Sequence, residues 1–200
     1  MPIWGVFTVP PLYAVVGLAN SARRSSNGID WEDVTVPGSG ALRNVRQFFG
    51  RLVVVGDGGR AYYTSDFRTF ETITTGTTEP IHDVVYHGGK YVIVGGNGLV
   101  KHTPDIFKAA PTWTTEVALT TDTLVRAATD TTNIVICSAS KTLTGTTVTG
   151  LALTTTIGGG LFRFGSLWIR YGAGGAVYTS TDKETWTKRV SNVTSNLIYA

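Results

Sequence analysis

The sequence has one cysteine and one methionine in 200 residues. A lone cysteine excludes an intrachain disulfide, and the apolar residues before Cys137 in "NIVICS" predict a buried, unreactive thiol. Charged residues make up only 16% of the chain, and the 17 lysines and arginines are scattered along it. Because nucleic-acid binding usually requires a clustered basic stripe, the net charge of +3 does not predict a nucleic-acid partner.

Long hydrophobic segments are also missing. No apolar run approaches the roughly 20 residues that span a bilayer, and the opening "MPIWGVFTVPP" lacks the basic stretch and cleavage site of a signal peptide. We therefore expect neither membrane insertion nor an export signal. Helical periodicity is absent as well, because no window of a dozen residues keeps an apolar helical stripe without a Gly or Pro break.

The residues that are abundant favour β-structure. The chain has 24 glycines, many threonines, and apolar segments rich in Val, Ile, Tyr and Phe. Branched and aromatic side chains suit a pleated, half-buried surface, and glycine supplies the turns between short strands. Hydrophobic residues at 42% are enough for an ordinary globular core. Together these features predict an all-β fold with many tight turns.

A strand ending in glycine recurs along the chain. The copies are "LYAVVG" ending at Gly17, "RLVVVG" at Gly56, "KYVIVG" at Gly95 and "LWIRYG" at Gly172, while "NIVICS" puts Cys137 at the same place. Eight residues after these positions come Ser25, Thr64, Thr103, Gly145 and Ser180. Ten residues after them come Asn27, Asp66, Asp105, Thr147 and Asp182. In four units an aromatic or apolar residue follows four later, whereas unit three reaches Trp113 four residues late, after an insertion. The sequence is therefore a fivefold repeat.

Each repeat unit of about 40 residues divides into four short strands joined by glycine-containing turns, as in "LRNVRQFF", "RLVVVG", "RAYYTSD" and "TFETITT". Four-stranded units of this length, repeated radially, are typical of a β-propeller. We predict one five-bladed, four-stranded antiparallel β-propeller domain over residues 1–200, closed around a narrow channel. The blades span approximately 1–37, 38–76, 77–119, 120–157 and 158–191, and residues 192–200 form a closing strand or one exchanged with a partner.

The segment "STDKETW", from Ser180 to Trp186, resembles the Asp box of Asp-box (BNR-like) propellers, which reads Ser-x-Asp-x-Gly-x-Thr-Trp. The resemblance implies that these residues lock the turn between the third and fourth strands, with the aromatic packed between blades. Because the motif recurs around the ring, we interpret it as structural and not catalytic. The residues concerned are Ser25, Asn27, Trp31, Thr64, Asp66, Phe70, Thr103, Asp105, Trp113, Ser180, Asp182 and Trp186.

Catalytic and metal-binding patterns are weak. The glutamates lie on predicted outer strands or in loops, and no two carboxylates are placed to face each other as a glycosidase requires. The three histidines, His82, His87 and His102, do not form a ligand cluster, and the glycine turns lack the helix that a phosphate-binding loop needs. We predict no enzyme activity, no metal and no cofactor.

The first strands of the units offer the one candidate ligand site. Arg46, Asp83, Arg126 and Arg163 lie on these strands, and the arginines could surround an anion in the channel. The simpler interpretation is that they are solvated or paired with Asp83.

No motif predicts the function, and only loop length and composition bear on it. The short loops, many threonines and few lysines resemble small propeller proteins of bacteriophage particles, which implies a structural or binding role in a tail, fibre or decoration component. On this hypothesis the chain attaches to other protein subunits, or to a host-surface glycan, and resides in the virion; otherwise it is cytoplasmic. The alternatives are a lectin-like carbohydrate-binding propeller and, more remotely, a glycosidase-related one.

Overall fold

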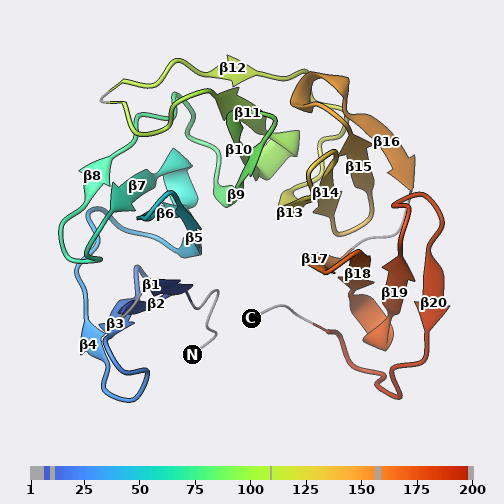
Figure 1. The fold of residues 1–200 in the computed structure, drawn as a ribbon, viewed down its shortest axis with the longest axis horizontal. Helices are drawn as coiled ribbons and strands as arrows, with labels where there is room; N and C mark the ends of the chain where they lie inside the picture. The colour runs from blue at the N-terminus through green and yellow to red at the C-terminus, as the bar shows by residue number, and fades with distance from the viewer. Residues whose placement is uncertain (1–6, 10–11, 109, 156–158, 198–200) are drawn as a thin grey trace.

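The computed structural model describes residues 7–9, 12–108, 110–155 and 159–197, and it contains five four-stranded antiparallel sheets. In each sheet the strands pair in chain order, from the inner strand outward, and the sheets follow one another around a common axis (Figure 1). The protein is a five-bladed β-propeller, as the repeat predicts. In the described part of the chain, no helix is long and apolar enough to cross a membrane.

The five sheets lie within the five predicted unit boundaries. Blade 1 consists of β1 (Phe7–Val9), β2 (Leu12–Val16), β3 (Ala22–Ser25) and β4 (Glu32–Asp33), and blade 2 of β5 (Leu42–Phe48), β6 (Arg51–Gly56), β7 (Ala61–Thr64) and β8 (Glu71–Thr72). Blade 3 consists of β9 (Ile81–His87), β10 (Lys90–Gly95), β11 (Val100–Thr103) and β12 (Thr114–Thr115). Blade 4 consists of β13 (Leu124–Thr129), β14 (Ile134–Ser138), β15 (Thr142–Gly145) and β16 (Ala152–Thr155), and blade 5 of β17 (Gly160–Phe164), β18 (Leu167–Tyr171), β19 (Val177–Ser180) and β20 (Thr187–Arg189). Short 3₁₀ turns are η1 (Asp57–Gly59), η2 (Gly96–Gly98), η3 (Val148–Gly150) and η4 (Ala173–Gly175).

The core lies between blades, which explains why the second strands are apolar throughout. In β6, Leu52 and Val54 pack with residues of blade 1, whereas Val53 and Val55 pack with residues of blade 3. Side chains alternate between the two faces of a strand, so a sheet sandwiched between two others needs apolar residues at every position. All four of these side chains are fully buried.

The register of blade 4 differs from the sequence prediction. Ser138, and not Cys137, occupies the glycine position, because Ser138 pairs with Leu124 as Gly56 pairs with Leu42. The amide of Ser138 bonds the carbonyl of Lys141, three residues on, whereas the corresponding bonds from the glycines span four residues. The turn is thus one residue shorter, which restores Gly145 to the predicted place opposite Ile134.

The five blades form an open arc and not the closed ring that we predict from the sequence. Figure 1 shows an opening between blade 1, in blue, and blade 5, in red. Each blade makes extensive contacts with the next blade along the chain. Among the described residues, no extensive contact joins a strand of blade 5 to a strand of blade 1. Consistent with this, Phe162 and Phe164 on β17 are 45% and 77% exposed.

The C-terminal segment does not close the arc within the described residues. Asn192–Leu197 contains no strand and runs along η4 of blade 5, where the amide of Leu197 bonds the carbonyl of Gly172. Residues 198–200 lie outside the described part of the chain, so closure or exchange of this segment stays a prediction.

Candidate binding surfaces

The corners between the third and fourth strands of blades 2 and 5 have the same hydrogen bonds. The hydroxyl of Ser180 accepts from the amides of Asp182 (3.2 Å) and Lys183 (2.7 Å) and donates to the Asp182 carboxylate (2.9 Å). That carboxylate in turn accepts from the amides of Glu184 (2.9 Å) and Thr185 (2.7 Å). In blade 2, Thr64 and Asp66 make the equivalent bonds. Both side chains are therefore used by the turn itself, which agrees with a structural role.

Blades 1, 3 and 4 show what the corner requires. In blade 1 the amide oxygen of Asn27 replaces the carboxylate and accepts from the amides of Ile29 and Asp30 at 2.8 and 2.9 Å. In blade 3 the corner is looser, since Thr103 lies 3.4 Å from the Asp105 amide and Asp105 accepts from Phe107 at 3.0 Å. Blade 4, without the motif, makes the 3₁₀ turn η3 instead.

The aromatic residues after the corners of blades 2, 3 and 5 pack toward the preceding blade, whereas Trp31 of blade 1 is partly exposed and belongs to none of the interblade clusters of the described residues. Phe70 lies against the cluster shared by blades 1 and 2, Trp113 against that of blades 2 and 3, and Trp186 against that of blades 4 and 5. Trp113 reaches its place despite the insertion before it, and its indole N–H donates to the Thr74 carbonyl at 2.8 Å. These rings contribute to blade packing and are not gathered into one site.

The predicted channel residues do not form a single cluster. Asp83 is fully buried. It accepts from Nε and Nη2 of Arg46, at 3.0 and 2.8 Å, and from the side-chain amide of Asn44 at 2.6 Å. It also accepts from the backbone amide of Ala127 at 3.0 Å. Asp83 therefore joins blades 2, 3 and 4, and its Coulomb attraction raises the pKa of Arg46.

The other two arginines have different surroundings. Arg126 is buried on β13, next to the residue that bonds Asp83. Arg163 is exposed on β17, and its guanidinium lies 5.7 Å from the centre of the Trp168 ring. Arg46 is thus paired with Asp83, as the simpler interpretation has it, and the anion site stays a prediction.

Two of the histidines, His87 and His102, make hydrogen bonds to other parts of the fold. His102 bonds the Glu116 carboxylate at 2.7 Å, and His87 bonds the Thr146 carbonyl at 3.0 Å. Among the described residues, no three His, Cys, Asp or Glu side chains are placed to hold a metal ion. Cys137 is fully buried, as predicted, and burial raises the pKa of its thiol to about 12.

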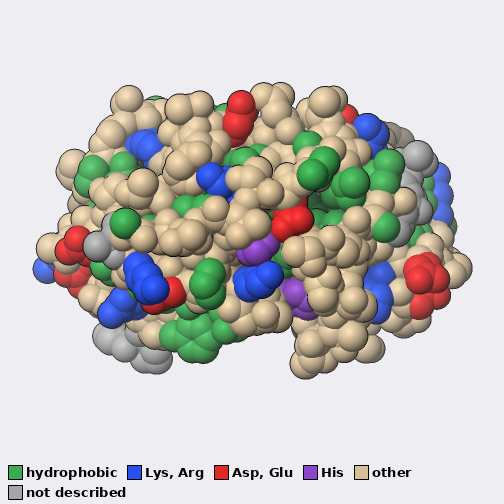
Figure 2. All heavy atoms as spheres, turned by 90° about the horizontal axis from the view of Figure 1, so that it is seen from above, with side chains coloured by type: hydrophobic (Ala, Val, Ile, Leu, Met, Phe, Trp, Pro, Cys, Tyr) green, Lys and Arg blue, Asp and Glu red, His purple; other side chains and the backbone are tan. Residues whose placement is uncertain are grey.

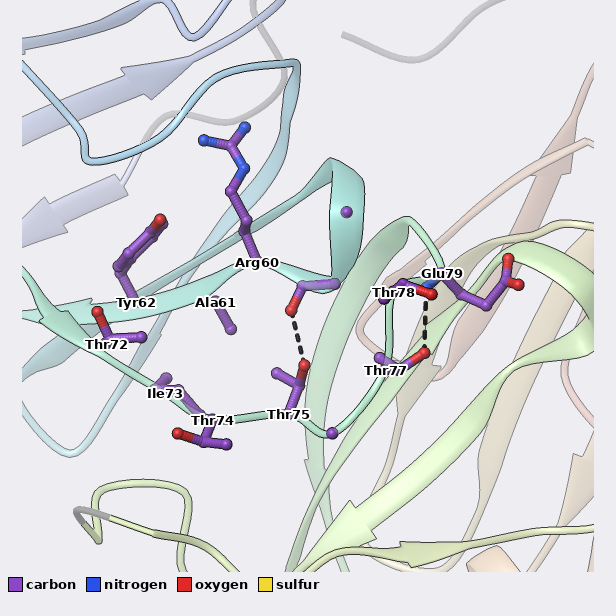
Figure 3. Close-up of a pocket in the computed structure, with 13 residues that line it drawn as sticks. Arg60, Ala61, Tyr62, Thr72, Ile73, Thr74, Thr75, Thr77, Thr78 and Glu79 are labelled. Carbon is purple, nitrogen blue, oxygen red and sulfur yellow. Dashed lines mark hydrogen bonds between the residues drawn. The ribbon is translucent and has the colours of Figure 1, made fainter.

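A threonine-rich groove of about 730 Å³ lies between β7 and the link from β8 to β9 (Figure 3). Several of its polar groups are engaged: Thr75 donates to the Gly59 carbonyl (2.7 Å), and the guanidinium of Arg60 bonds carbonyls of Pro37 and Ala41. Beneath the link, the buried Lys101 donates to the Thr75 and Gly76 carbonyls at 2.7 and 3.0 Å. We interpret the groove as a consequence of the link's path.

A second surface gathers aromatic rings from blades 2 and 3, and the described residues of the other blades form no cluster of this size. We call it the aromatic rim; its members are Phe48, Phe49, Tyr63, Tyr86, Tyr91 and Phe107. Successive rings lie 4.9–5.4 Å apart, and the Arg51 guanidinium lies over two of them. Tyr91 is buried and anchors the set, whereas Phe49 and Tyr86 are 74% and 37% exposed.

Phe49 has an unusual backbone for its size. It has φ +50° at the β5–β6 turn, where the matching turn of blade 3 has Gly88 with φ +55°. A left-handed conformation costs a residue with a Cβ about 1–2 kcal/mol, and the exposed ring gives little burial in return. Sequence reasoning missed this site, although "QFFGR" places two aromatics at a turn where glycine is expected.

Charge does not mark a further site on the side of the molecule over blades 2 to 4. Figure 2 shows Lys and Arg side chains interspersed with Asp and Glu there, separated by uncharged surface. This distribution agrees with the scattered charges of the sequence.

Comparisons with known proteins support the fold. No protein-family model and no curated protein sequence matches the chain. Among solved structures, YCF48 bound to D1 peptide superposes with a TM-score of 0.74 at 15% identity, over 98% of this chain and 70% of that one. The WD40 β-propeller domain of Doa1 gives 0.71 at 12% identity, over 96% and 70%.

An ancestral GH74 enzyme also superposes, with a TM-score of 0.74 at 11% identity, but this chain covers only 32% of its length. At such identities the likenesses establish the propeller fold alone. None of them identifies the chain as a member of the Asp-box or a bacteriophage family.

Proposed function

We propose that this chain is a non-enzymatic binding propeller that attaches to another protein through the aromatic rim. The observation that carries the proposal is Phe49, whose ring is 74% exposed on a left-handed backbone. Strain retained at an exposed, bulky residue points to a role other than folding. Exposed Phe and Tyr rings anchored on buried ones are also the side chains that protein interfaces favour.

Two further facts support a protein partner. The rim combines rigid rings with one cation, Arg51, and aromatic and arginine side chains dominate interface energetics. The solved YCF48 structure is of a form bound to D1 peptide, so a propeller of this fold can bind a peptide. The absence of enzyme activity belongs to the same proposal, since the carboxylates at the described corners are used by backbone amides.

We further propose that the partner belongs to a virus particle, as the short loops and threonine-rich composition suggest. Mass spectrometry of purified particles from the source of this chain would test it. Finding the chain at a fixed stoichiometry supports a virion component, and its absence from the particles contradicts that location while leaving protein binding open.

The variant Phe49→Gly tests the site. Glycine relieves about 1–2 kcal/mol of backbone strain and forfeits about 0.5–1.5 kcal/mol of ring contact with Tyr86, so the free energy of unfolding should change by no more than about 1 kcal/mol. Peptides selected from a display library on the wild-type chain should nevertheless lose at least tenfold in affinity. Val117→Gly, at an 87% exposed apolar site outside the rim, is the matched control. Selected peptides that bind wild type and Phe49→Gly equally would place binding elsewhere and contradict the proposal.

Carbohydrate is the second candidate ligand, because the exposed rings of Phe49 and Tyr86 meet edge to face at 5.3 Å and leave ring faces open. The same pair of variants on a glycan array distinguishes the two classes. Glycan signals lost in Phe49→Gly and kept in Val117→Gly, with no peptide selected, would favour the lectin-like alternative.

A further inference from the structure

The outer part of the interface between blades 3 and 4 lacks the aromatic ring found in the other interblade clusters. Phe70, Trp113 and Trp186 each follow a corner and pack toward the preceding blade. Phe70 comes six residues after the end of β7, and the residue six after the end of β15 is Leu151. Leu151 packs against the cluster shared by blades 3 and 4, but its side chain is smaller than a ring.

Two more positions on the same face of blade 4 have lost a ring. Leu143 lies on β15 where Tyr62 lies on β7, because each pairs with the corresponding residue of the second strand. Val148 follows the end of β15 by three residues, as Phe67 follows the end of β7. In blade 2, Phe70 contacts the rings of Tyr62 and Phe67 edge to face. In blade 4, aliphatic side chains therefore replace a cluster of three rings.

The missing volume is a groove of about 180 Å³ between the two blades, which we call the blade 3–4 groove. Leu143, Val148 and Leu151 line it from blade 4, and Val100 lines it from blade 3. An apolar cavity of about 150 Å³ holds one benzene molecule, so this groove has room for a single aromatic ring. Ligands of drug size need roughly 300 Å³ or more and are too large for it.

A carboxylate lies on the blade 3 side of this groove. The amide of Glu116 bonds the Val100 carbonyl, as the amide of Ile73 bonds the Ala61 carbonyl in blade 2, so the two residues are equivalent. Ile73 is buried in an apolar interblade cluster. The side chain of Glu116 instead lines the groove and is 19% exposed. An acid thus occupies a position that packs an apolar side chain elsewhere.

The charge of Glu116 has no lysine or arginine partner among the described residues. The Nε2 atom of His102 lies 2.7 Å from the Oε1 atom of Glu116. The Nδ1 atom of His102 is buried without a hydrogen-bond partner in the described structure, so a second ring proton would have no acceptor there. A neutral ring that donates from Nε2 orients the carboxylate and leaves its negative charge for a ligand.

We propose that the blade 3–4 groove binds a free aromatic amine, with one planar ring and an ammonium group on a short chain. The ring takes the place of the missing aromatic side chain, against Leu143, Val148 and Leu151. The ammonium group donates to the Glu116 carboxylate, which is a charge-assisted hydrogen bond. This site is separate from the aromatic rim, and the inference does not depend on the rim.

Phenethylamine is the probe, and 2-phenylethanol, with the same ring and chain but no charge, is its comparator. Titrations followed by methyl NMR should give a dissociation constant of about 1 mM for the amine, with shifts at Leu143, Val148 and Leu151 and none at Leu52, between blades 1 and 2. The alcohol should bind about fivefold more weakly, because a partly exposed ion pair contributes modestly. No methyl shift at about tenfold that amine concentration, or equal affinity for both compounds, would overturn the proposal.

A variant that restores the repeat provides a second test. Leu151→Trp supplies the missing ring from the chain itself, so it should raise the melting temperature by a few degrees and abolish binding of phenethylamine. Leu153→Trp is the matched control, because Leu153 is 50% exposed on β16 and does not line the groove. This control should bind the amine as wild type does. Binding of the amine to Leu151→Trp with wild-type affinity would place the ligand elsewhere and overturn the proposal.

Glu116→Gln keeps the proposal falsifiable if Leu151→Trp fails to fold. The amide oxygen of glutamine still accepts a hydrogen bond from His102, but the negative charge is gone. The amine should then bind no more tightly than the alcohol, and the affinity for the alcohol should be unchanged. A preference for the amine that persists in Glu116→Gln would show that Glu116 does not hold the ammonium group, and the proposal would be wrong.

Discussion

At the scale of residues, the recurring corner is a hydrogen-bonding device in which one oxygen accepts two backbone amides. Asp66, Asp182 and Asn27 all do this, so an acceptor oxygen is required and a negative charge is not. The residue after each of these is Phe67, Lys183 or Gly28, and each has a positive φ. The motif therefore fixes a strained turn at three places of the arc.

Replacement of Asp182 separates a structural role from a chemical one. Asp182→Ala removes the acceptor for the amides of Glu184 and Thr185 and should lower the melting temperature by a few degrees. Asp182→Asn should keep most of the stability, because Asn27 fills the same role in blade 1. Differential scanning calorimetry compares the three proteins, and equal melting temperatures for Ala and wild type would refute the structural role.

Acid should destabilise the protein through the same corners. Burial acts to raise the pKa of Asp66, but the amides of Thr69 and Arg68 hold it well below its usual range. The amides of Thr185 and Glu184 likewise lower the pKa of Asp182. Since the unfolded-state pKa of Asp is about 3.9, the stabilisation is complete above roughly pH 5 and is lost as pH falls below 4.

Urea unfolding at a series of pH values checks this dependence. The variant Asp66→Asn/Asp182→Asn should show a shallower decrease of the unfolding midpoint between pH 5 and 3 than wild type. An unchanged slope would assign the acid sensitivity to other carboxylates.

At the scale of elements, close contacts between turns and links hold the blades in register. Gly58 and Gly59 both have positive φ in η1, but only Gly59 lies against the Thr77 carbonyl of the following link. Asp83 makes a comparable connection at the inner strands of three blades. Among the described residues, close backbone approaches and an ion pair with a buried carboxylate, Asp83, therefore hold the arc together besides its apolar interfaces.

The two glycines provide a matched pair of variants. Gly58→Ala should cost about 1 kcal/mol of stability, because only its backbone conformation is strained. Gly59→Ala should cost about 3 kcal/mol, because its Cβ also displaces the link. Chemical denaturation measures both, and equal losses would show that the link contact does not constrain the turn.

Loss of Asp83 should be among the most damaging single changes. Asp83→Ala leaves the Arg46 guanidinium and the Asn44 amide without their acceptor, and breaking a buried pair costs about 3–5 kcal/mol. The double variant Asp83→Ala/Arg46→Met should recover part of the loss. If the double variant is as unstable as the sum of its single variants, the pair is not coupled and this assignment is wrong.

The sequence predicts the blades well because the repeat records local chemistry. Apolar second strands, glycine turns and hydroxyl–carboxylate corners are each set by residues close in sequence, so their positions follow from alignment of the units. The register at Ser138 does not follow from that alignment. The turn after Ser138 is shorter by one residue, and this hides the one-residue shift of the strand before it. The aromatic rim is also missed, since Phe49 meets Tyr86 only after blades 2 and 3 pack. Opening of the arc depends on the angle between neighbouring blades. Side-chain packing sets this angle, and the number of repeats does not set it.

At the scale of the whole molecule, the described strands of the five blades form an open arc whose last face is uncovered. Four interblade interfaces are filled by apolar side chains, and the fifth, between blades 5 and 1, is not formed among the described residues. An isolated propeller normally closes its ring and so removes exposed sheet faces. The open form explains why Phe162 and Phe164 are exposed in an otherwise well-packed chain.

Cysteine labelling of the last face tests whether the arc is open. The native Cys137 is buried, with a raised pKa, and provides a silent background in the folded state. Phe162→Cys and Val85→Cys place a thiol at the same strand position of blades 5 and 3, and each reacts with a maleimide under native conditions according to its exposure. With an open arc, we expect rapid labelling at position 162, and labelling at position 85 only upon unfolding. Protection of both positions would contradict it, because the ring would then be closed.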